Sequence, residues 1–363
     1  MRLSAKVLII GSGPAGASAA RLLAAHGRDV LLLEKNLSFE KPCGGGLSLR
    51  AFEELGIPKT SIKREVRRIR IVSPCGEGVD IALTGCGLAI VGRKEFDSAL
   101  RQEAESKGAK IVEGEFTEIQ HSKNYTVKAM TGEKQFEIDT EYVIAADGVN
   151  SRVRTALGIK PSRSFFTVFE KIRDVNADIC EFWFGGDHAP FSYSWVFPAT
   201  EGISVGTGTF QRGMITNLLQ RFKEKRGIHA AGTKKVYRIP AWKGDLYSKG
   251  NVLFAGDSAG QVLPLTYEGI YYAIKSGELA AQAIIEEKAD TYRKAWKARF
   301  QKRFVLMDIL RNYFLKDDAS AERLVALHRR PEIQEASLQL WIMKDSTQKG
   351  LLHYIKLFGK FLR

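Results

Sequence analysis

The segment Gly11-Ser12-Gly13-Pro14-Ala15-Gly16, close to the start of a chain of 363 residues, is the most informative part of the sequence about its architecture. An apolar, β-branched run at 6–10 precedes it, and residues 17–26 follow with the alanine- and leucine-rich pattern of a helix. A second apolar run at 29–33 ends on Glu34. This order predicts a β-α-β unit with a glycine-rich turn after its first strand.

The glycine spacing is typical of a dinucleotide-binding turn. The first glycine permits the tight turn, the second lets the backbone approach a pyrophosphate, and the third lets the helix pack on the sheet, with its N-terminus toward the phosphates. Glu34 stands about 20 residues on, where a carboxylate accepts hydrogen bonds from ribose hydroxyls and repels a 2′-phosphate. We therefore expect FAD or NAD, not NADP, in contact with Gly11, Gly13, Pro14, Ala15, Gly16 and Glu34.

A second motif distinguishes between these two cofactors. In Asn251-Val252-Leu253-Phe254-Ala255-Gly256-Asp257 a strand ends on Gly-Asp, ahead of a helix expected at 268–286. Asp257 can bind ribityl hydroxyls, and the helix N-terminus at Gly269 and Ile270 can stabilise the negative charge of a reduced flavin. The alternative is that Asp257 only caps the helix. Together with the first motif, this one favours FAD.

A third motif, Asp147-Gly148 with Ser151 and Arg154, follows a strand expected at 142–146. With it the chain resembles the FAD-dependent group that includes the aromatic hydroxylases and the geranylgeranyl reductases, from the first strand to about residue 283. Arg93-Lys94-Glu95-Phe96-Asp97-Ser98-Ala99-Leu100 is similar to the RxxFDxxL segment of that group. We accordingly expect further cofactor contacts at Lys35, Arg93, Phe116 and Asp147.

Two stretches indicate the branch of this group. Lys41-Pro42-Cys43-Gly44-Gly45-Gly46-Leu47-Ser48 resembles the PCGG segment of the geranylgeranyl reductases, which lies beside the flavin ring. Tyr193-Ser194-Trp195-Val196-Phe197-Pro198 resembles their YxWxFP motif, which lines the substrate tunnel. A period of two puts the three rings on one face of a strand, a wall suited to an apolar chain with π bonds, although plain core packing also produces such a stripe.

The resemblance implies cofactor contacts at Cys43, Gly44, Gly45 and Gly46, with Cys43 also a catalytic candidate or simply a small buried residue. It implies substrate contacts at Tyr193, Trp195, Phe197, Pro198 and Tyr267. The last is a departure, because the family's T-G-E-G-I reads Thr266-Tyr267-Glu268-Gly269-Ile270 here. We expect the tyrosine to narrow the space near the flavin.

The hypothesis that follows is reduction of carbon-carbon double bonds in a polyprenyl chain carried by a lipid, quinone or diphosphate. Reduced FAD would deliver a hydride to the alkene, after reduction by NADPH or a ferredoxin-type carrier. A monooxygenase or halogenase acting on a hydrophobic substrate is one alternative, and a flavin electron carrier docked on a membrane complex is another. Against the halogenase stands the absence of the W-x-W-x-I-P form, since positions 193 and 197 are Tyr193 and Phe197.

Composition bounds the partners and the location. A net charge of +14 favours contact with something anionic, but no zinc-finger spacing or other nucleic-acid motif accompanies it, so no nucleic-acid partner is expected. The four cysteines lack CxxC spacing, which favours a reducing cytoplasm. Because the dinucleotide motif comes so early we expect no signal peptide, and since no apolar run is long enough to cross a bilayer we expect no transmembrane helix. Residues 351–363 combine large apolar residues with lysines at helical spacing, either for a membrane interface or for ordinary packing.

The pattern of elements predicts an α/β protein with an inserted antiparallel sheet and C-terminal helices. We expect a Rossmann-type FAD-binding domain in three pieces, at 1–60, 93–160 and 244–286. Strands of a substrate domain are expected at 61–92, its antiparallel sheet at 161–243, and a helical region at 287–363.

Overall fold

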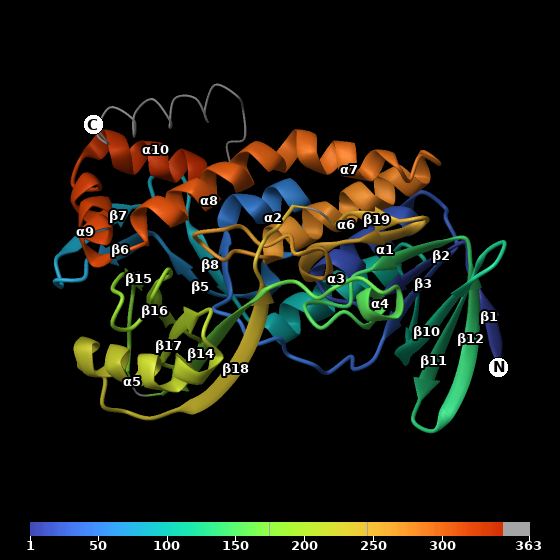
Figure 1. Ribbon diagram of the computed structural model, residues 1–363, viewed down its shortest axis with the longest axis horizontal. Coiled ribbons are helices and arrows are strands. Elements are labelled where there is room, and N and C mark those ends of the chain that lie inside the picture. Colours follow the sequence, from blue (N-terminus) through green and yellow to red (C-terminus); the bar gives the residue numbers. More distant parts are fainter. Residues whose placement is uncertain (174, 245, 344–363) are drawn as a thin grey trace. The chain divides into compact units, whose positions relative to one another are not determined.

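The computed structural model describes residues 1–173, 175–244 and 246–343. This part of the chain forms two compact units, each assembled from separate stretches (Figure 1). Unit 1 contains Met1–Lys41, Arg93–Ser164 and Ile239–Gln301, and unit 2 contains Pro42–Gly92, Phe165–Arg238 and the chain from Lys302 on. Within the described residues the chain passes between the units at 41/42, 92/93, 164/165, 238/239 and 301/302.

The centre of unit 1 is a mainly parallel sheet of order β19-β20-β13-β2-β3-β9, in which only the β19–β20 pair is antiparallel. Its strands are β2 (Val7–Ile10), β3 (Val30–Glu34), β9 (Lys110–Glu113), β13 (Tyr142–Ala145), β19 (Ser248–Lys249) and β20 (Val252–Phe254). The helical segments are α1 (Pro14–Ala25), α3 (Arg93–Ser106), α4 (Arg152–Ala156), η3 (Gly256–Ala259), α6 (Ile270–Ile285), α7 (Thr291–Trp296) and η4 (Lys297–Gln301).

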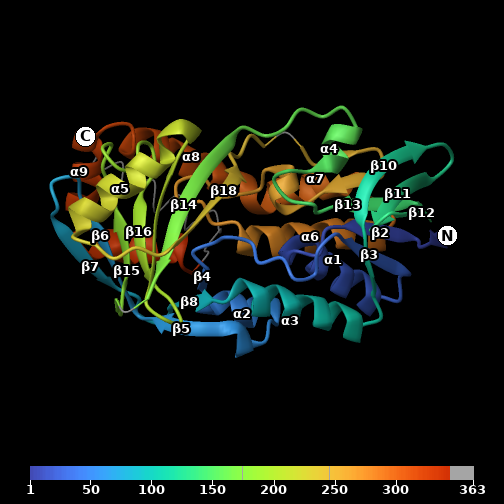
Figure 2. The ribbon, with the colours of Figure 1, turned by 90° about the horizontal axis from the view of Figure 1, so that it is seen from below.

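A second sheet covers one face of this one, in the order β1-β12-β11-β10. Its strands are β1 (Arg2–Ser4), β10 (Glu115–His121), β11 (Tyr125–Thr131) and β12 (Lys134–Thr140). Alternate residues of β2, including Leu8, share a hydrophobic core with Val127 and Ile138 of the second sheet. Ile9 faces α1, which in turn packs against α6 (Figure 2). Because side chains alternate along β2, one set packs in the core between the two sheets and the other set packs against α1.

Unit 2 is built on a sheet of order β18-β14-β17-β16-β15-β6-β7. Its strands are β6 (Arg68–Val72), β7 (Gly78–Ala82), β14 (Ser164–Ile172), β15 (Cys180–Trp183), β16 (Ser194–Pro198), β17 (Ile203–Thr209) and β18 (Thr233–Pro240). Helix α5 (Ile215–Arg226) covers one face, with Leu219 and Phe222 packed against Val168, Val196 and Val205.

The remaining elements of unit 2 are a small sheet and several helices. The small sheet has the order β4-β8-β5, with β4 (Gly46–Ser48), β8 (Leu88–Val91) and β5 (Ile62–Val66). The helical segments are α2 (Leu49–Leu55), η1 (Lys59–Ser61), η2 (Arg212–Met214), α8 (Lys302–Phe314), α9 (Asp318–Leu327) and α10 (Pro331–Trp341). The α/β class with an antiparallel sheet and C-terminal helices is thus confirmed.

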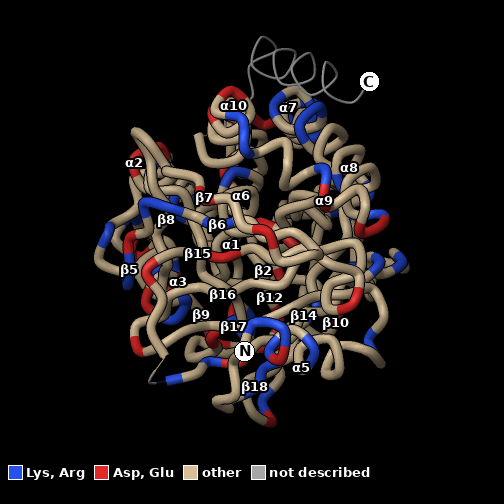
Figure 3. Tube along the Cα trace, turned by 90° about the vertical axis from the view of Figure 1, so that its left-hand side faces the viewer, with Lys and Arg blue, Asp and Glu red and all other residues tan. Residues whose placement is uncertain are grey.

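Basic side chains recur along several elements of the trace, β18 and α7 among them (Figure 3). In the part of the chain that the structure describes, no helix has the length and apolar character needed to span a bilayer. The stretch at 351–363, for which a membrane interface was one of two expectations, lies outside the described residues.

Candidate functional site

Three turns singled out by the sequence meet in unit 1, at the carboxyl ends of neighbouring parallel strands. Gly11 follows β2, Asp147 follows β13 and Gly256 follows β20. A Cβ atom placed on Gly11 would lie 2.4 Å from the carbonyl oxygen of Ala146. One placed on Gly256 would lie 3.1 Å from the Cβ of Ala15. This edge of an open α/β sheet is where such folds bind their ligands.

The glycine turn has the backbone geometry that close approach requires. Gly11 has φ +97°, a left-handed conformation that favours glycine. A Cβ on Gly16 would meet the carbonyl oxygen of Gly11 at 1.8 Å, so α1 could not pack there with a larger residue. A Cβ on Gly13, by contrast, would have no atom of the described residues within 4 Å. The turn is therefore tight against the sheet but open at the N-terminus of α1.

Glu34 is fixed at the end of β3 by backbone and side-chain donors. Its Oε2 accepts hydrogen bonds from the backbone N–H and the hydroxyl of Ser12, at 2.7 and 2.9 Å. Its Oε1 accepts from the N–H of Asn36 at 3.1 Å. A carboxylate oxygen has two acceptor positions, so Oε2 is fully used and Oε1 retains one position for a ribose hydroxyl.

Asp147 is a half-buried residue whose two carboxylate oxygens differ in their hydrogen bonding. Its Oδ2 accepts from the N–H of Val153 at 3.1 Å, whereas Oδ1 has no hydrogen-bond partner among the described residues. Burial raises the pKa of Asp147, and hydrogen bonds from Ser151 and the α4 backbone counteract that rise. An orphaned buried oxygen of this kind is rare unless a ligand or water completes it.

Asp257 lies in η3, where its side chain is buried and forms an ion pair with Lys41. Its Oδ1 is 3.6 Å from the position of a Cβ on Gly269, the residue that precedes α6. The carboxylate is therefore next to the helix N-terminus, as the sequence suggested. Its ion pair with Lys41 was not predicted from the sequence. The lysine was visible only as the residue before the Pro-Cys-Gly segment.

Arg154 joins two of the three turns. Its guanidinium donates to the carbonyl oxygen of Ser258 at 3.0 Å and to the hydroxyl of Ser162 at 2.6 Å. Ser258 in turn donates to the carbonyl oxygen of Ala145 at 2.5 Å. Since Ala145 ends β13, these bonds tie the Asp147 turn to the Asp257 turn. The role of Arg154 in the third motif is one of anchoring.

The other predicted contacts of unit 1 lie in different settings. Arg93 is buried at the start of α3 and forms an ion pair with Asp97, with N···O distances of 2.8 and 3.1 Å. Phe116 lies in the core between the two sheets of unit 1. Lys35 is exposed, and its Nζ lies 4.0 Å from Oε1 of Glu115. Cofactor contact by these three remains a prediction.

In unit 2 the Pro-Cys-Gly-Gly segment forms a tight loop ahead of β4. The N–H of Gly45 donates to Sγ of Cys43 at 3.3 Å. Gly45 has φ +74°, and a Cβ on it would lie 2.6 Å from the carbonyl oxygen of Val91. A Cβ on Gly44 would lie 3.0 Å from the ring of Phe197. Glycine is thus required here for the loop to lie against the aromatic strand.

The aromatic residues share one face of the sheet of unit 2, as their spacing predicted. The ring centroid of Trp195 lies 6.4 Å from that of Tyr193 and 6.3 Å from that of Phe197. Phe182 of β15 stands 5.2 Å from Tyr193 and 5.1 Å from Phe197. A Cβ on Gly206 of β17 would come within 2.2 Å of the Trp195 ring, so the glycine makes room for the indole.

We call Phe182, Tyr193, Trp195 and Phe197 the aromatic face. Pro198, the last residue of β16, pairs with Ile203. Trp195 has a buried indole N–H without a hydrogen-bond partner in the described part of the chain. A buried donor of this kind can bind an acceptor on a ligand or an ordered water.

Tyr267 has φ +53° in the loop before α6. Its N–H donates to the carbonyl oxygen of Leu263 at 3.0 Å, which closes the turn. The left-handed backbone gives a physical reason for the family's glycine at this position, because a Cβ is disfavoured there. Its contact with substrate remains a prediction.

The residues of unit 1 fit a dinucleotide with a flavin. The open N-terminus of α1 suits a pyrophosphate, the free acceptor position on Oε1 of Glu34 suits a ribose, and Asp147 offers a buried acceptor. The N-terminus of α6, next to Asp257, suits the electron-rich side of an isoalloxazine. Among the described residues no group of three His, Cys, Asp or Glu side chains could hold a metal ion.

Comparison with known proteins agrees with this set of residues. The model of the FAD-binding domain family matches residues 4–291. The geranylgeranyl diphosphate reductase of Synechocystis sp. is 29% identical, over 98% of this chain and 96% of that protein. The digeranylgeranylglycerophospholipid reductase of Methanosarcina acetivorans is 30% identical, over 86% of each chain.

The fold agrees as well. The crystal structure of a geranylgeranyl bacteriochlorophyll reductase-like protein from Thermoplasma acidophilum superposes with a TM-score of 0.84. That match covers 98% of this chain and 96% of the other, at 24% identity.

The protein is therefore an FAD-dependent oxidoreductase. Within that class, the chain belongs to the geranylgeranyl reductase family of flavoproteins with an FAD-binding domain.

Proposed function

We propose that the protein reduces carbon-carbon double bonds of a polyprenyl chain carried by a lipid, quinone or diphosphate. The observation that carries the proposal is the packing of Gly44 against Phe197, with a distance of 3.0 Å from a Cβ position to the ring. Two segments more than 150 residues apart in the sequence thereby form one surface. The names of the relatives support the same substrate class.

The aromatic face supplies an apolar surface whose rings attract the π bonds of an isoprenoid. It also excludes water from the reacting carbons, which favours transfer of a hydride over its loss to solvent. FAD, when bound and reduced, supplies that hydride equivalent. The protonation that completes the reduction then comes from a nearby acid or from water.

Contact between the flavin and Cys43, Gly44, Gly45 and Gly46 is part of the proposal. Its support is the family pattern and the chain order, because Lys41, the partner of Asp257, is separated from Cys43 only by Pro42. Cys43 is the candidate donor of the proton. Replacement by serine keeps a small donor, so Cys43→Ser should retain more turnover than Cys43→Ala if the thiol has this role.

The decisive experiment uses the protein reconstituted with FAD and reduced anaerobically with dithionite. Geranylgeranyl diphosphate and a geranylgeranylated glycerophospholipid are added, and the products are analysed by mass spectrometry. We expect a gain of one pair of hydrogens for each bond reduced. Unchanged prenyl chains would exclude the reductase. In a separate aerobic assay, oxygen consumption that depends on the substrate would favour a monooxygenase instead.

The electron donor and the membrane are separate parts of the proposal. We infer reduction by NADPH or by a ferredoxin-type carrier, to be tested by following the bleaching of the flavin with each donor. Peripheral binding to an anionic membrane follows from the net charge of +14 and a lipid-like substrate. Sedimentation with phosphatidylglycerol vesicles at low and high salt tests it, and no binding at low salt would exclude it.

A further inference from the structure

The aromatic strand β16 has a second side, which the proposed function does not use. Antiparallel pairing places Trp195 opposite Gly206, and Val196 opposite Val205. Because successive side chains alternate, Ser194 and Val196 point away from the aromatic face, toward the side covered by α5. The same register brings Ser194 opposite Thr207, one residue beyond the paired part of β16 and β17.

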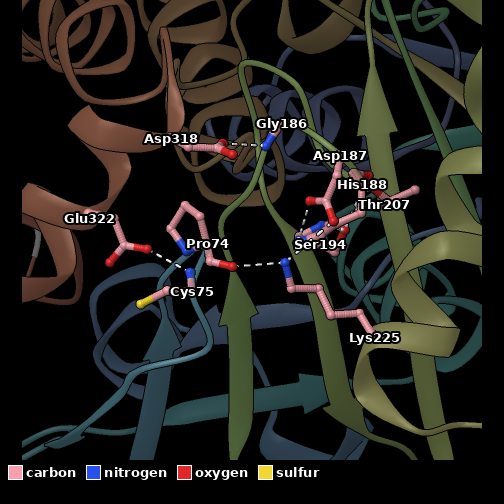
Figure 4. Close-up of polar contacts among 10 residues, drawn as sticks. All are labelled: Pro74, Cys75, Gly186, Asp187, His188, Ser194, Thr207, Lys225, Asp318 and Glu322. Atoms are coloured by element: carbon pink, nitrogen blue, oxygen red, sulfur yellow. Dashed lines mark hydrogen bonds and ion pairs between the residues drawn. The ribbon is translucent and has the colours of Figure 1, made fainter.

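Hydrogen bonds among His188, Ser194 and Thr207 form a closed ring at this position (Figure 4). His188 takes part with two groups, its backbone carbonyl oxygen and its Nδ1. Thr207 Oγ1 donates to the carbonyl oxygen of His188 at 2.6 Å, and Ser194 Oγ donates to Thr207 Oγ1 at 2.9 Å. The ring is completed by His188 Nδ1 and Ser194 Oγ, 2.8 Å apart. With Ser194 donating to Thr207, the tautomer that fits the ring is the one in which Nδ1 donates to Ser194.

The ring is fully buried. His188 and Ser194 have no exposed surface, and neither has Thr207. Burial lowers the pKa of His188 to about 4, so the imidazole is neutral at pH 7. Nε2 has no hydrogen-bond partner among the described residues, and the nearest carboxylate oxygen, of Asp187, is 3.7 Å away. Each hydrogen bond of the ring is therefore costly to lose, because water cannot replace it.

The loop that carries His188 is itself held in place. Gly185 has φ +154°, and a Cβ on it would lie 2.9 Å from His188 Nε2, so no larger residue fits. The N–H of Gly186 donates to Asp318 of α9 at 2.7 Å. Lys225 of α5 donates to the carbonyl oxygen of Pro74 at 2.8 Å and lies 3.4 Å from Asp187. Contacts with α9 and α5 therefore fix the loop that carries the imidazole of His188.

We propose that His188, Ser194 and Thr207 are positioning residues that fix the start of β16 and thereby the orientation of the Tyr193 and Trp195 rings for the prenyl chain. The inference rests on the proposed function for its substrate, but not for its geometry. Tyr193 and Trp195 flank Ser194 in the sequence, so rotation of the backbone there moves both rings together. Two rings that shift by a fraction of an ångström contact a long apolar chain less closely and bind it less tightly, while they still cover the reacting carbons.

The test compares Thr207→Val with Thr207→Ser in the FAD-loaded protein. Valine has the shape of threonine but cannot receive the Ser194 proton, whereas serine keeps the hydroxyl. We expect Thr207→Val to raise KM for geranylgeranyl diphosphate about tenfold, with kcat within about twofold of the parent, and Thr207→Ser to restore KM. Equal KM values for Thr207→Val and the parent would overturn the proposal.

A matched control separates positioning from general loss of stability. Ser337 of α10 is also a buried serine that hydrogen-bonds a buried histidine, at 2.9 Å from His328 Nε2, but it is not on the aromatic strand. Ser337→Ala should lower the melting temperature as Thr207→Val does, and leave KM unchanged. A parallel rise of KM in Ser337→Ala would show that the effect is only destabilisation.

Near-UV circular dichroism tests the geometry without any substrate, because the coupled Tyr193 and Trp195 rings, 6.4 Å apart, contribute to it. We expect a changed spectrum for Thr207→Val and parental spectra for Thr207→Ser and Ser337→Ala. Failure of the parent to reduce any prenyl chain would remove the proposed function alone. An unchanged Thr207→Val spectrum would remove the positioning role alone.

Discussion

At the scale of single residues, the carboxylate of Asp257 depends on Lys41 for its charge balance. The side chain of Asp257 is 7% exposed, so the ion pair is poorly solvated. Removing one partner of such a pair leaves an uncompensated charge, which costs more than an exposed ion pair contributes. The lysine also brings a positive charge to a turn that we predict to face an anionic cofactor.

We expect Lys41→Met to raise the dissociation constant of FAD about tenfold, because the negative charge of Asp257 would then act on the cofactor unbalanced. Fluorescence titration of the apoprotein with FAD measures it. Lys110→Met is the matched control, since Lys110 is exposed and its partner Asp29 lies at the surface, 3.5 Å away. An affinity equal to that of the control would contradict the role of Lys41.

Tyr267 allows a second test at this scale. Tyr267→Gly and Tyr267→Ala both remove the ring, but only alanine keeps a Cβ in the left-handed backbone at φ +53°. The glycine variant should therefore be more stable by about 1 kcal/mol, measured as a difference in free energy of unfolding. An alanine variant as stable as the glycine variant would show that the turn relaxes.

Contacts between residues far apart in the chain are the part of the site that could not be predicted from the sequence. Glu34 and Asp147 follow apolar strands that the pattern reveals, so their places at the sheet edge could be predicted. Lys41 and Asp257 are separated by 216 positions, and no local pattern pairs them. His188 has no motif around it, and its partners were visible only as the small residue inside the aromatic motif and a threonine 19 positions on.

At the scale of elements, the contact between α1 and α6 sets the geometry of the glycine turn. A Cβ on Gly277 of α6 would lie 2.1 Å from the carbonyl oxygen of Ala15 in the first turn of α1. The two helices can approach this closely only because residue 277 has no side chain. The contact lies directly behind the N-terminus of α1, where the phosphates are expected.

Gly277→Ala should therefore push α6 away from α1, lower the free energy of unfolding by about 1–3 kcal/mol and weaken FAD binding. Denaturant titration with and without FAD measures both effects. Gly213→Ala is the control, since a Cβ on Gly213 would have no atom of the described residues within 4 Å. A Gly277→Ala protein with parental stability would mean that the helices separate without cost.

The elements themselves were largely predictable, because periodicity is a local signal. The strand expected at 6–10 is β2, and the helix expected at 17–26 is the body of α1. The helix expected from 268 begins at Ile270, because residues 263–268 close a turn in which the N–H of Leu263 bonds the carbonyl oxygen of Glu268 at 3.0 Å. The parallel pairing of β15 with β6 depends on long-range contacts that the pattern does not encode.

At the scale of the whole molecule, two buried histidines link folding to pH. Burial lowers the pKa of His188 and of His328 to about 4. His328 is held neutral between α9 and α10, with Nδ1 donating to the carbonyl oxygen of Leu324 at 2.8 Å. In the unfolded chain both side chains titrate near 6.5, so the unfolded state binds protons first as the pH falls.

Stability should thus be complete above pH ~6.5 and fall as the pH drops toward ~4, by roughly 3 kcal/mol for each histidine. Melting temperatures between these limits measure the slope. His328→Gln should reduce that slope by about half, whereas His26→Gln, at an exposed position, should not alter it. A slope in the His328→Gln protein equal to the parent's would assign the pH dependence to other groups.

The alternation of the chain between its two units has a consequence for engineering. Each unit is contributed by three stretches, joined at 41/42, 92/93, 164/165, 238/239 and 301/302. A chimera that exchanges one whole unit with that of a relative therefore needs a seam at every one of these joints. Nicking a single joint with a protease would leave the halves tethered by the remaining crossings, so the gene cannot be cut into two independently expressed modules at any one position.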